Sequence, residues 1–168
     1  MKTHFVYKPK IQPLPKNLFL EFKERGFYKM ITTESPRVVG IMDAEPTKID
    51  GKKFFQIFLL YIKEQRQGYG KEFIEFAKNR SKQLDCDGRL FLMADSGVLG
   101  AEKPPHIFYR KQGFTTSDKK YLKKIDSFIK ENKEMENEDS KPIYMYYLPK
   151  KLTFLQQIVM RLKEFFKM

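Results

Sequence analysis

The sequence contains few of the residues that bind structural metals or form disulfide bonds. Its 168 residues include one cysteine, Cys86, two histidines, His4 and His106, and no tryptophan. This scarcity excludes an internal disulfide framework and a cysteine-based zinc site, and we expect no bound metal. The longest wholly apolar run, Ile57–Ile62, is far shorter than a membrane span. The N-terminus MKTHFVYKPK is charged too early for a signal peptide. These absences predict a soluble, cytoplasmic, globular protein.

Positive charge is present in excess. The chain has 33 Lys and Arg residues against 21 Asp and Glu residues, which gives a formal net charge of +12. Such an excess attracts nucleotides, phosphorylated cofactors, RNA and acidic surfaces, but a solvated lysine-rich surface produces the same sum. Charge alone therefore leaves a nucleic-acid partner open.

Hydrophobic periodicity predicts a mixture of strands and helices. We expect strands over 4–7, 27–33, 37–44, 53–62, 89–94 and 143–148, and helices over 17–25, 69–84 and 106–111. Strand 53–62 is almost wholly apolar, which is typical of a strand buried on both faces, and Asp50-Gly51 before it predicts a hairpin turn. Strands 53–62 and 89–94 with the helix between them form a βαβ unit, so the two strands should be parallel. The charged residues 117–141 fit either a helix or a mobile loop.

The chain is expected to form one domain over residues 1–150, followed by an amphipathic helix within 151–168. The apolar positions of that helix are Leu155, Ile158, Val159, Leu162, Phe165 and Phe166. Docking on its own domain or a contact in a homodimer is favoured over a membrane surface, because Gln156, Gln157 and Glu164 dilute its basic face.

A glycine-rich turn connects strand 53–62 to helix 69–84. Its residues are Gln65, Arg66, Gln67, Gly68, Tyr69, Gly70 and Lys71. The first N–H groups of a helix lack internal partners, and the glycines let a phosphate approach them. The turn is not a P-loop, because Glu72 stands where Ser or Thr is required, and Phe73 replaces the third glycine of a dinucleotide fingerprint. A turn that only reverses the chain is the alternative.

A second stretch, Ile107–Phe114 (IFYRKQGF), follows the next strand. In this order, the two stretches closely resemble the GNAT superfamily of acyl-CoA-dependent N-acetyltransferases: the first is similar to its pyrophosphate-binding motif and the second to its FYxKxGF helix. The resemblance covers residues 53–114. It implies a single α/β domain (α+β in some schemes) with a central mixed, mostly antiparallel sheet, one splayed parallel strand pair and flanking helices. It also implies acetyl-CoA as acyl donor.

The same resemblance assigns roles to individual residues. The backbone of the strand that carries Phe58 and Leu60 would bind the pantetheine arm, and the amides from Gln65 to Lys71 would bind the pyrophosphate. A backbone N–H near Leu60 would polarise the thioester carbonyl. Tyr109 would donate a hydrogen bond or a proton to the leaving sulfur, with an ordinary core aromatic as the alternative. Reference pKa values of about 10 for tyrosine and about 8.5 for a thiol make full transfer uphill by roughly 2 kcal/mol, unless nearby positive charge reduces the gap.

The general base is not identified by the sequence. Many members of the superfamily carry a glutamate on the strand that matches 89–94, and this strand (RLFLMA) has no acid. The candidates are Asp95, Glu64, Glu45 and Glu102, and a water chain or an amine of low pKa would remove the need for a base. For His106 we expect a capping role on helix 106–111, with a place in the lining of the site as the alternative, and we expect Cys86 to be a packing residue.

The sequence therefore predicts an acetyl-CoA-dependent N-acetyltransferase that transfers an acetyl group to a primary amine by direct attack in a ternary complex. The acceptor amine is not identified. One alternative is an enzyme that acetylates RNA-linked or ribosomal amines, which the net charge favours. The other is a non-catalytic CoA-binding or nucleic-acid-binding module on the same fold, with which the missing strand glutamate agrees.

Overall fold

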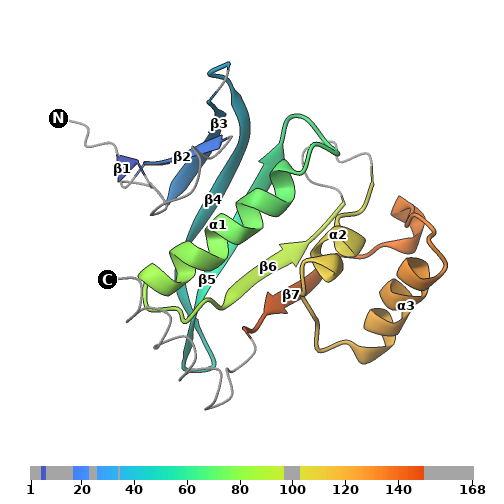
Figure 1. The fold of residues 1–168 in the computed structure, drawn as a ribbon. Coiled ribbons are helices and arrows are strands. Elements are labelled where there is room, and N and C mark those ends of the chain that lie inside the picture. Colours follow the sequence, from blue (N-terminus) through green and yellow to red (C-terminus); the bar gives the residue numbers. More distant parts are fainter. Residues whose placement is uncertain (1–4, 7–16, 23–25, 34, 97–102, 150–168) are drawn as a thin grey trace, which may run out of the picture.

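The computed structural model describes residues 5–6, 17–22, 26–33, 35–96 and 103–149 (Figure 1). Its strands are β1 (Phe5–Val6), β2 (Asn17–Phe22), β3 (Phe27–Thr32), β4 (Val38–Ile49), β5 (Lys52–Ile62), β6 (Leu90–Ala94) and β7 (Ile143–Tyr147). Its helices are α1 (Tyr69–Gln83), α2 (His106–Lys111) and α3 (Lys119–Lys130), with a short 3-10 helix, η1, at Asn137–Asp139. The predicted helix within 151–168 lies outside the described residues.

The strands form one sheet in chain order from β1 to β7. Every neighbouring pair is antiparallel except β5 and β6, which are parallel and are connected by α1. The predicted fold class, a mixed and mostly antiparallel sheet with one parallel pair and flanking helices, is confirmed. Within the charged stretch 117–141, the helical alternative is correct, because α3 and η1 both lie in it.

The hairpin between β4 and β5 turns at Asp50 and Gly51, both of which have positive φ (48° and 74°), as the sequence predicts. Strand β4 is longer than predicted and continues through Pro46. A proline is tolerated there because β3 pairs with β4 only as far as Asp43, so the missing N–H of Pro46 removes no hydrogen bond to β3.

The helix predicted over 17–25 is wrong. Residues Asn17–Phe22 form β2, which pairs with β3 along its whole length. The apolar residues Leu18, Phe19 and Phe22 fit a helical stripe, but a run this short does not distinguish a helix from a strand. Gly26, which fits a helix stop, lies instead in the turn to β3 with φ +62°.

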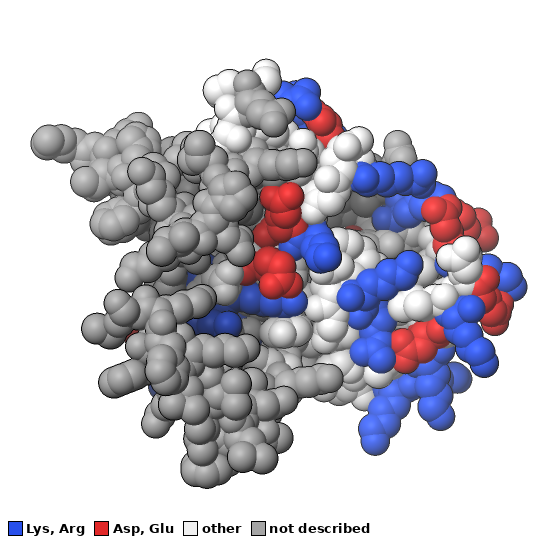
Figure 2. Space-filling model, in the orientation of Figure 1, with Lys and Arg blue, Asp and Glu red and all other residues white. Residues whose placement is uncertain are grey.

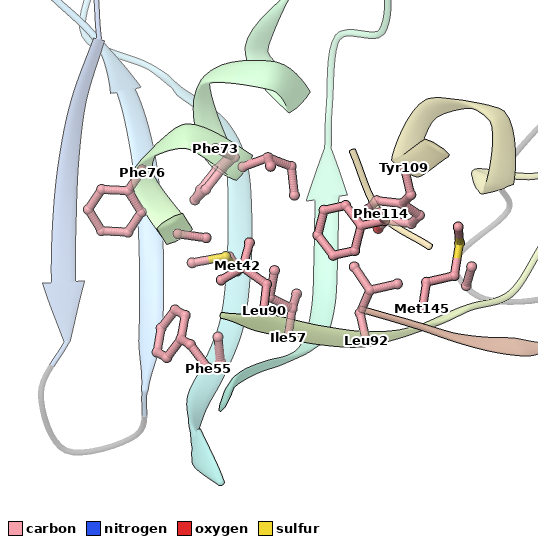
Figure 3. Packing of buried hydrophobic residues seen from close by; sticks show 14 of the residues in the cluster. Met42, Phe55, Ile57, Phe73, Phe76, Leu90, Leu92, Tyr109, Phe114 and Met145 are labelled. Carbon is pink, nitrogen blue, oxygen red and sulfur yellow. The ribbon is translucent and has the colours of Figure 1, made fainter. Parts of the chain in front are cut away.

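The core lies between the sheet and the helices (Figures 1 and 3). Helix α1 crosses one face of the sheet and buries Phe73, Ile74, Phe76 and Ala77 against it. Buried side chains of the strands complete the same cluster, among them Met42, Phe55, Ile57, Leu90, Leu92 and Met145. Cys86 is also buried in this cluster, and burial raises the pKa of its thiol, in agreement with a packing role.

The prediction that strand 53–62 is buried on both faces holds only for its first half. Phe54, Phe55 and Ile57 are buried, whereas Phe58 is 53% exposed and Tyr61 is 40% exposed. The second half of β5 is therefore accessible on one face.

No helix among the described residues is long and apolar enough to cross a membrane.

Gly26→Ala is expected to destabilise the fold more than Gly51→Ala. Both glycines have positive φ, so both alanines incur the left-handed penalty of about 1–2 kcal/mol. A Cβ on Gly26 would lie 2.5 Å from the carbonyl oxygen of Ala44, whereas one on Gly51 has nothing within 4 Å. The clash also disturbs the hydrogen bond from Ala44 N to Gly26 O, which adds about 1 kcal/mol. Urea unfolding measures both variants, and equal losses would contradict this account of Gly26.

Candidate active site

Strand β5 contains one more residue than β4 at Phe58. Ala44 pairs with Ile57 and the next residue of β4, Asp43, pairs with Leu59, so Phe58 has no partner on β4 and forms a β-bulge. The bulge shifts the alternation of the strand: Ile57 packs into the core before it and Leu60 after it, while Phe58 is exposed. Phe58 and Leu60, two residues apart, therefore do not share a face as regular alternation would require.

The parallel pairing of β5 and β6 stops beside this bulge. Its last pair is Ile57 with Leu92, although both strands continue. Beyond β5, the N–H of Lys63 donates to Val39 O at 2.9 Å. In an antiparallel ladder, alternate residues point toward the partner strand, so the N–H and C=O groups of Leu60 and Ile62 point away from β4. Among the described residues, no strand pairs with them on that side, and an extended ligand can do so.

The predicted phosphate turn begins where β5 ends. Helix α1 starts at Tyr69, and its N-cap residue, Gly68, has φ +86° and no capping side chain. The amides of Tyr69, Gly70 and Lys71 donate to no backbone acceptor in the described part of the chain. A Cβ placed on Gly68 would have nothing within 4 Å. The turn thus presents open amides with the polarity that binds phosphate.

The polar and charged side chains of this turn are at the surface. Gln65, Gln67 and Lys71 are exposed, as is Arg66, and Tyr69 is half-buried. Arg66 forms an ion pair with Glu134 at 3.5 Å, and Lys103 pairs with the same carboxylate. Exposed ion pairs of this kind are weak, so a bound phosphate can compete with Glu134 for Arg66.

Gly70 also makes room for α2. A Cβ on Gly70 would lie 3.1 Å from Cζ of Phe108, so a side chain at this position would crowd that ring. Phe108 belongs to the second sequence motif. The two motifs, which are separated by a whole strand in the sequence, are therefore in direct contact.

Tyr109 lies on α2 and is 8% exposed. Its ring packs against Phe108 with a centroid distance of 5.2 Å. It also packs against Phe114 at 5.5 Å (Figure 3). No hydrogen bond joins its hydroxyl to another described residue. Burial raises the pKa of Tyr109 above the usual value, and no nearby cation opposes that shift. The positive charge that would reduce the gap to a thiol is therefore not supplied by the described residues.

Hydrogen bonds of Arg110, which the sequence did not predict, hold α2 in place. Arg110 donates two hydrogen bonds to Asp126 on α3, at 2.7 and 3.1 Å, and one to Phe114 O at 3.2 Å. The hydrogen bond with Asp126 raises the pKa of Arg110. Because the two partners are 16 residues apart and on different helices, no sequence spacing indicates this pair.

His106 does not cap α2, contrary to the prediction. The N-cap is Pro105, without a side-chain hydrogen bond, and His106 is fully buried. Its Nε2 lies 2.9 Å from Lys141 O, which accepts, so Nε2 carries the hydrogen. Nδ1 then carries a lone pair and has no partner among the described residues. Burial lowers the pKa of His106.

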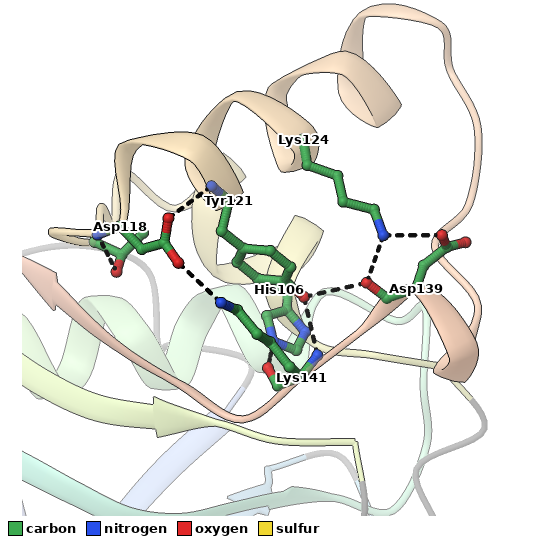
Figure 4. A network of polar contacts seen from close by, with 7 residues as sticks. His106, Asp118, Tyr121, Lys124, Asp139 and Lys141 are labelled. Carbon is green, nitrogen blue, oxygen red and sulfur yellow. Dashed lines mark hydrogen bonds and ion pairs between the residues drawn. The ribbon is translucent and has the colours of Figure 1, made fainter.

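A polar network surrounds His106 (Figure 4). The ring of Tyr121 packs edge-on against the imidazole, and its hydroxyl accepts from Lys141 N at 3.1 Å. Lys141 Nζ in turn pairs with Asp118, which caps α3 through Tyr121 N. These contacts join α2, α3 and the segment that leads into β7.

The four candidates for the general base lie in different surroundings. Glu64 is paired with Arg37 at 3.0 Å, and Glu102 lies outside the described residues. Asp95 follows β6 and is close enough to His106 to affect its pKa, whereas Glu45 is exposed on β4 opposite Gln56. The structure does not single out one of them. Within the described ranges, no group of three His, Cys, Asp or Glu residues fits a metal ion.

The basic residues around α3 are interspersed with acids (Figure 2). Lys124 pairs with Asp139, and Lys133 pairs with Glu131. This part of the surface therefore agrees with a solvated, mixed-charge face as much as with an anion-binding one.

Comparison with known proteins finds no matching family model and no matching curated protein. Solved structures do match. The NatB acetyltransferase complex with a bisubstrate inhibitor matches with 16% identity and a TM-score of 0.49, over 76% of this chain and 70% of that one. The NatC complex with CoA and a Gag peptide matches with 14% identity and a TM-score of 0.48, over 73% and 70%.

A third match is a GCN5-related glucosamine N-acetyltransferase region in a fungal multi-domain enzyme, with 18% identity and a TM-score of 0.45. It covers 55% of this chain, which spans only 12% of that protein. Similarity at this level does not carry an argument about function. The sheet itself is mixed and mostly antiparallel with one parallel pair, which is the arrangement that the resemblance to the GNAT superfamily implies.

Stability should depend on pH through His106. Its pKa is lowered by folding, so the unfolded chain binds more protons below the unfolded pKa of about 6.5, and stability falls as the pH drops. His106→Gln keeps an amide donor for Lys141 O but does not titrate. We expect the stability advantage of the wild type over this variant to shrink between pH 7.5 and pH 5.5 in urea unfolding. An unchanged advantage across that range would contradict a buried neutral imidazole.

Proposed function

We propose that this protein is an acetyl-CoA-dependent N-acetyltransferase that acts on a primary amine. The observation that carries the proposal is the opening between β5 and β6. The parallel pair separates after Ile57 and Leu92 and leaves the backbone groups of Leu60 and Ile62 without a strand partner. The same strand leads directly to the open amides of α1. Pantetheine amides and a pyrophosphate are the two ligand parts that this combination suits.

The proposed reaction is a direct transfer in a ternary complex. The neutral amine nitrogen attacks the thioester carbonyl, the carbon–nitrogen bond forms, and the carbon–sulfur bond then breaks. The N–H of Leu60 stabilises the carbonyl oxygen as it becomes negative. The thiolate leaves with the bonding electron pair and accepts a hydrogen bond from Tyr109. The nitrogen releases its extra proton to a base or to water.

Tyr109 has the properties of a hydrogen-bond donor rather than those of an acid. Burial keeps its hydroxyl protonated, and no hydrogen bond joins that hydroxyl to another described residue. The contact of Gly70 with Phe108 supports its placement, because it fixes the tyrosine helix beside the phosphate turn. The alternative is a non-catalytic CoA-binding or nucleic-acid-binding module on the same fold. Activity measurements decide between this module and the enzyme.

Gly68→Val should weaken CoA binding at least roughly tenfold, which corresponds to about 1.4 kcal/mol. The new side chain would stand in front of the open amides, where nothing now lies within 4 Å. Gly51→Val is the matched control, since Gly51 has a similar positive φ and equally open surroundings in the β4–β5 turn. Calorimetry on both variants measures the dissociation constant. Equal CoA affinity in the Gly68 variant and the wild type would refute the phosphate site.

Tyr109→Phe should lower kcat by about 10²–10⁴-fold while CoA affinity is retained, because the hydroxyl acts on the leaving sulfur and not on the bound ground state. Tyr144→Phe, which removes the hydroxyl of an exposed tyrosine, is the control. Turnover is followed as thiol release with a panel of primary amines. Wild-type turnover in the Tyr109 variant would make Tyr109 an ordinary core aromatic. CoA binding without turnover by the wild type on any amine would favour the non-catalytic module.

A further inference from the structure

The face of the sheet opposite α1 is apolar and accessible at β5, β6 and β7. We call it the aromatic face and define it by Phe58, Phe91, Met93 and Tyr144. Phe58, Met93 and Tyr144 are 53%, 49% and 59% exposed. Met93 and Tyr144 are directly paired across β6 and β7, and the rings of Phe91 and Tyr144 stack with a centroid distance of 5.2 Å. Phe91, Met93 and Tyr144 are thus a continuous surface across β6 and β7, and Phe58 is exposed on the neighbouring strand β5.

Side chains this apolar normally have a partner. Contiguous exposed apolar patches on a soluble protein mark an interaction site. On the other face of the same strands, Leu90, Leu92 and Met145 are fully covered by the core. The aromatic face is therefore the side of this part of the sheet on which another element can still be placed.

The chain leaves the described structure beside this face. Tyr147, the last residue of β7, pairs with Leu90, the first residue of β6, so the chain exits at the edge of the sheet where β6 begins. Leu148 follows and is 50% exposed. The core side of these strands is already filled, so the aromatic face is the side on which a following segment has room to pack.

The sequence that follows has the pattern that the aromatic face requires. Residues 152–168 carry an apolar stripe at helical spacing, including Leu155, Ile158 and Leu162. As a helix they would span about 25 Å, enough to extend beyond the five residues of β7. We propose that residues 152–168 form a helix that docks with this stripe on the aromatic face of the same chain.

The net charge and the covalent link to the domain favour residues 152–168 over a second copy of the chain as the partner of the aromatic face. Each chain carries a net charge of +12, so two copies repel one another. A tethered segment acts at an effective concentration of the order of mM without any such assembly. Asp43 and Glu45 on β4 border the bulge at Phe58, and residues 152–168 contain three cations and one acid. This proposal does not depend on acetyl transfer.

Cysteine cross-linking in the full-length chain tests the docking. Met93→Cys is combined in turn with Leu155→Cys, Ile158→Cys and Leu162→Cys on the stripe, and with Gln156→Cys and Gln157→Cys on the polar side. Cys86 is fully buried and stays in all variants. Met93→Cys alone is the blank. We expect a disulfide within one chain for at least one stripe variant, formed at least roughly tenfold faster than for the polar-side controls, since bridging needs Cα atoms within about 7 Å.

The results of these experiments distinguish residues 152–168 of the same chain from a second copy of the chain on the aromatic face. Disulfide-linked dimers that form preferentially from the stripe variants would show that a second copy covers the face and would overturn the proposal. Equal rates for stripe and polar positions would overturn it as well. Trypsin cleavage at Arg161 and Lys163 is the second measurement: Met93→Glu should speed it at least roughly tenfold, while Val38→Glu, at a 40% exposed apolar position outside the aromatic face, should not. Unchanged cleavage in the Met93→Glu protein would also contradict the docked helix.

Discussion

The middle of the sheet is organised by a single unpaired residue. Phe58 has no partner on β4, so β5 changes which side chains face the core halfway along its length. The parallel ladder to β6 stops at the same point, after Ile57. A regular β5 would continue to pair with β6 and would close the opening. The bulge therefore creates both the free backbone groups at Leu60 and Ile62 and the exposed ring at Phe58.

Two glycines after the end of β5 shape the surroundings of this opening, each in a different way. Gly68 adopts a left-handed conformation and leaves the first amides of α1 open. Gly70 has no positive φ and instead lets Phe108 approach the helix. As a result, the end of β5, the start of α1 and the tyrosine helix α2 form one connected unit. A ligand that binds the turn at Gly68 therefore lies close to α2, which carries the second sequence motif.

Local features of the sequence could be predicted, and long-range ones could not. The hairpin at Asp50-Gly51, helix α1 and the parallel pair follow from turn chemistry and periodicity, which are local. Helix 17–25 was wrong because the pairing of β2 with β3 decides between two conformations that its short apolar run allows equally. The bulge at Phe58 has no local marker in a run of apolar residues. The roles of His106 and Asp126 depend on partners far along the chain, at Lys141 and Arg110.

The burial of Tyr109 restricts the chemistry of the proposed reaction. Reference values already make proton transfer from tyrosine to a thiolate uphill by roughly 2 kcal/mol, and burial raises the tyrosine pKa further. No cation acts on Tyr109 in the opposite direction within the described structure. A hydrogen bond to the thiolate avoids this cost because the proton stays on oxygen. The proton that finally reaches the sulfur must then come from the attacking amine or from water, which makes a dedicated carboxylate acid or base on β6 unnecessary for the departure of the thiolate.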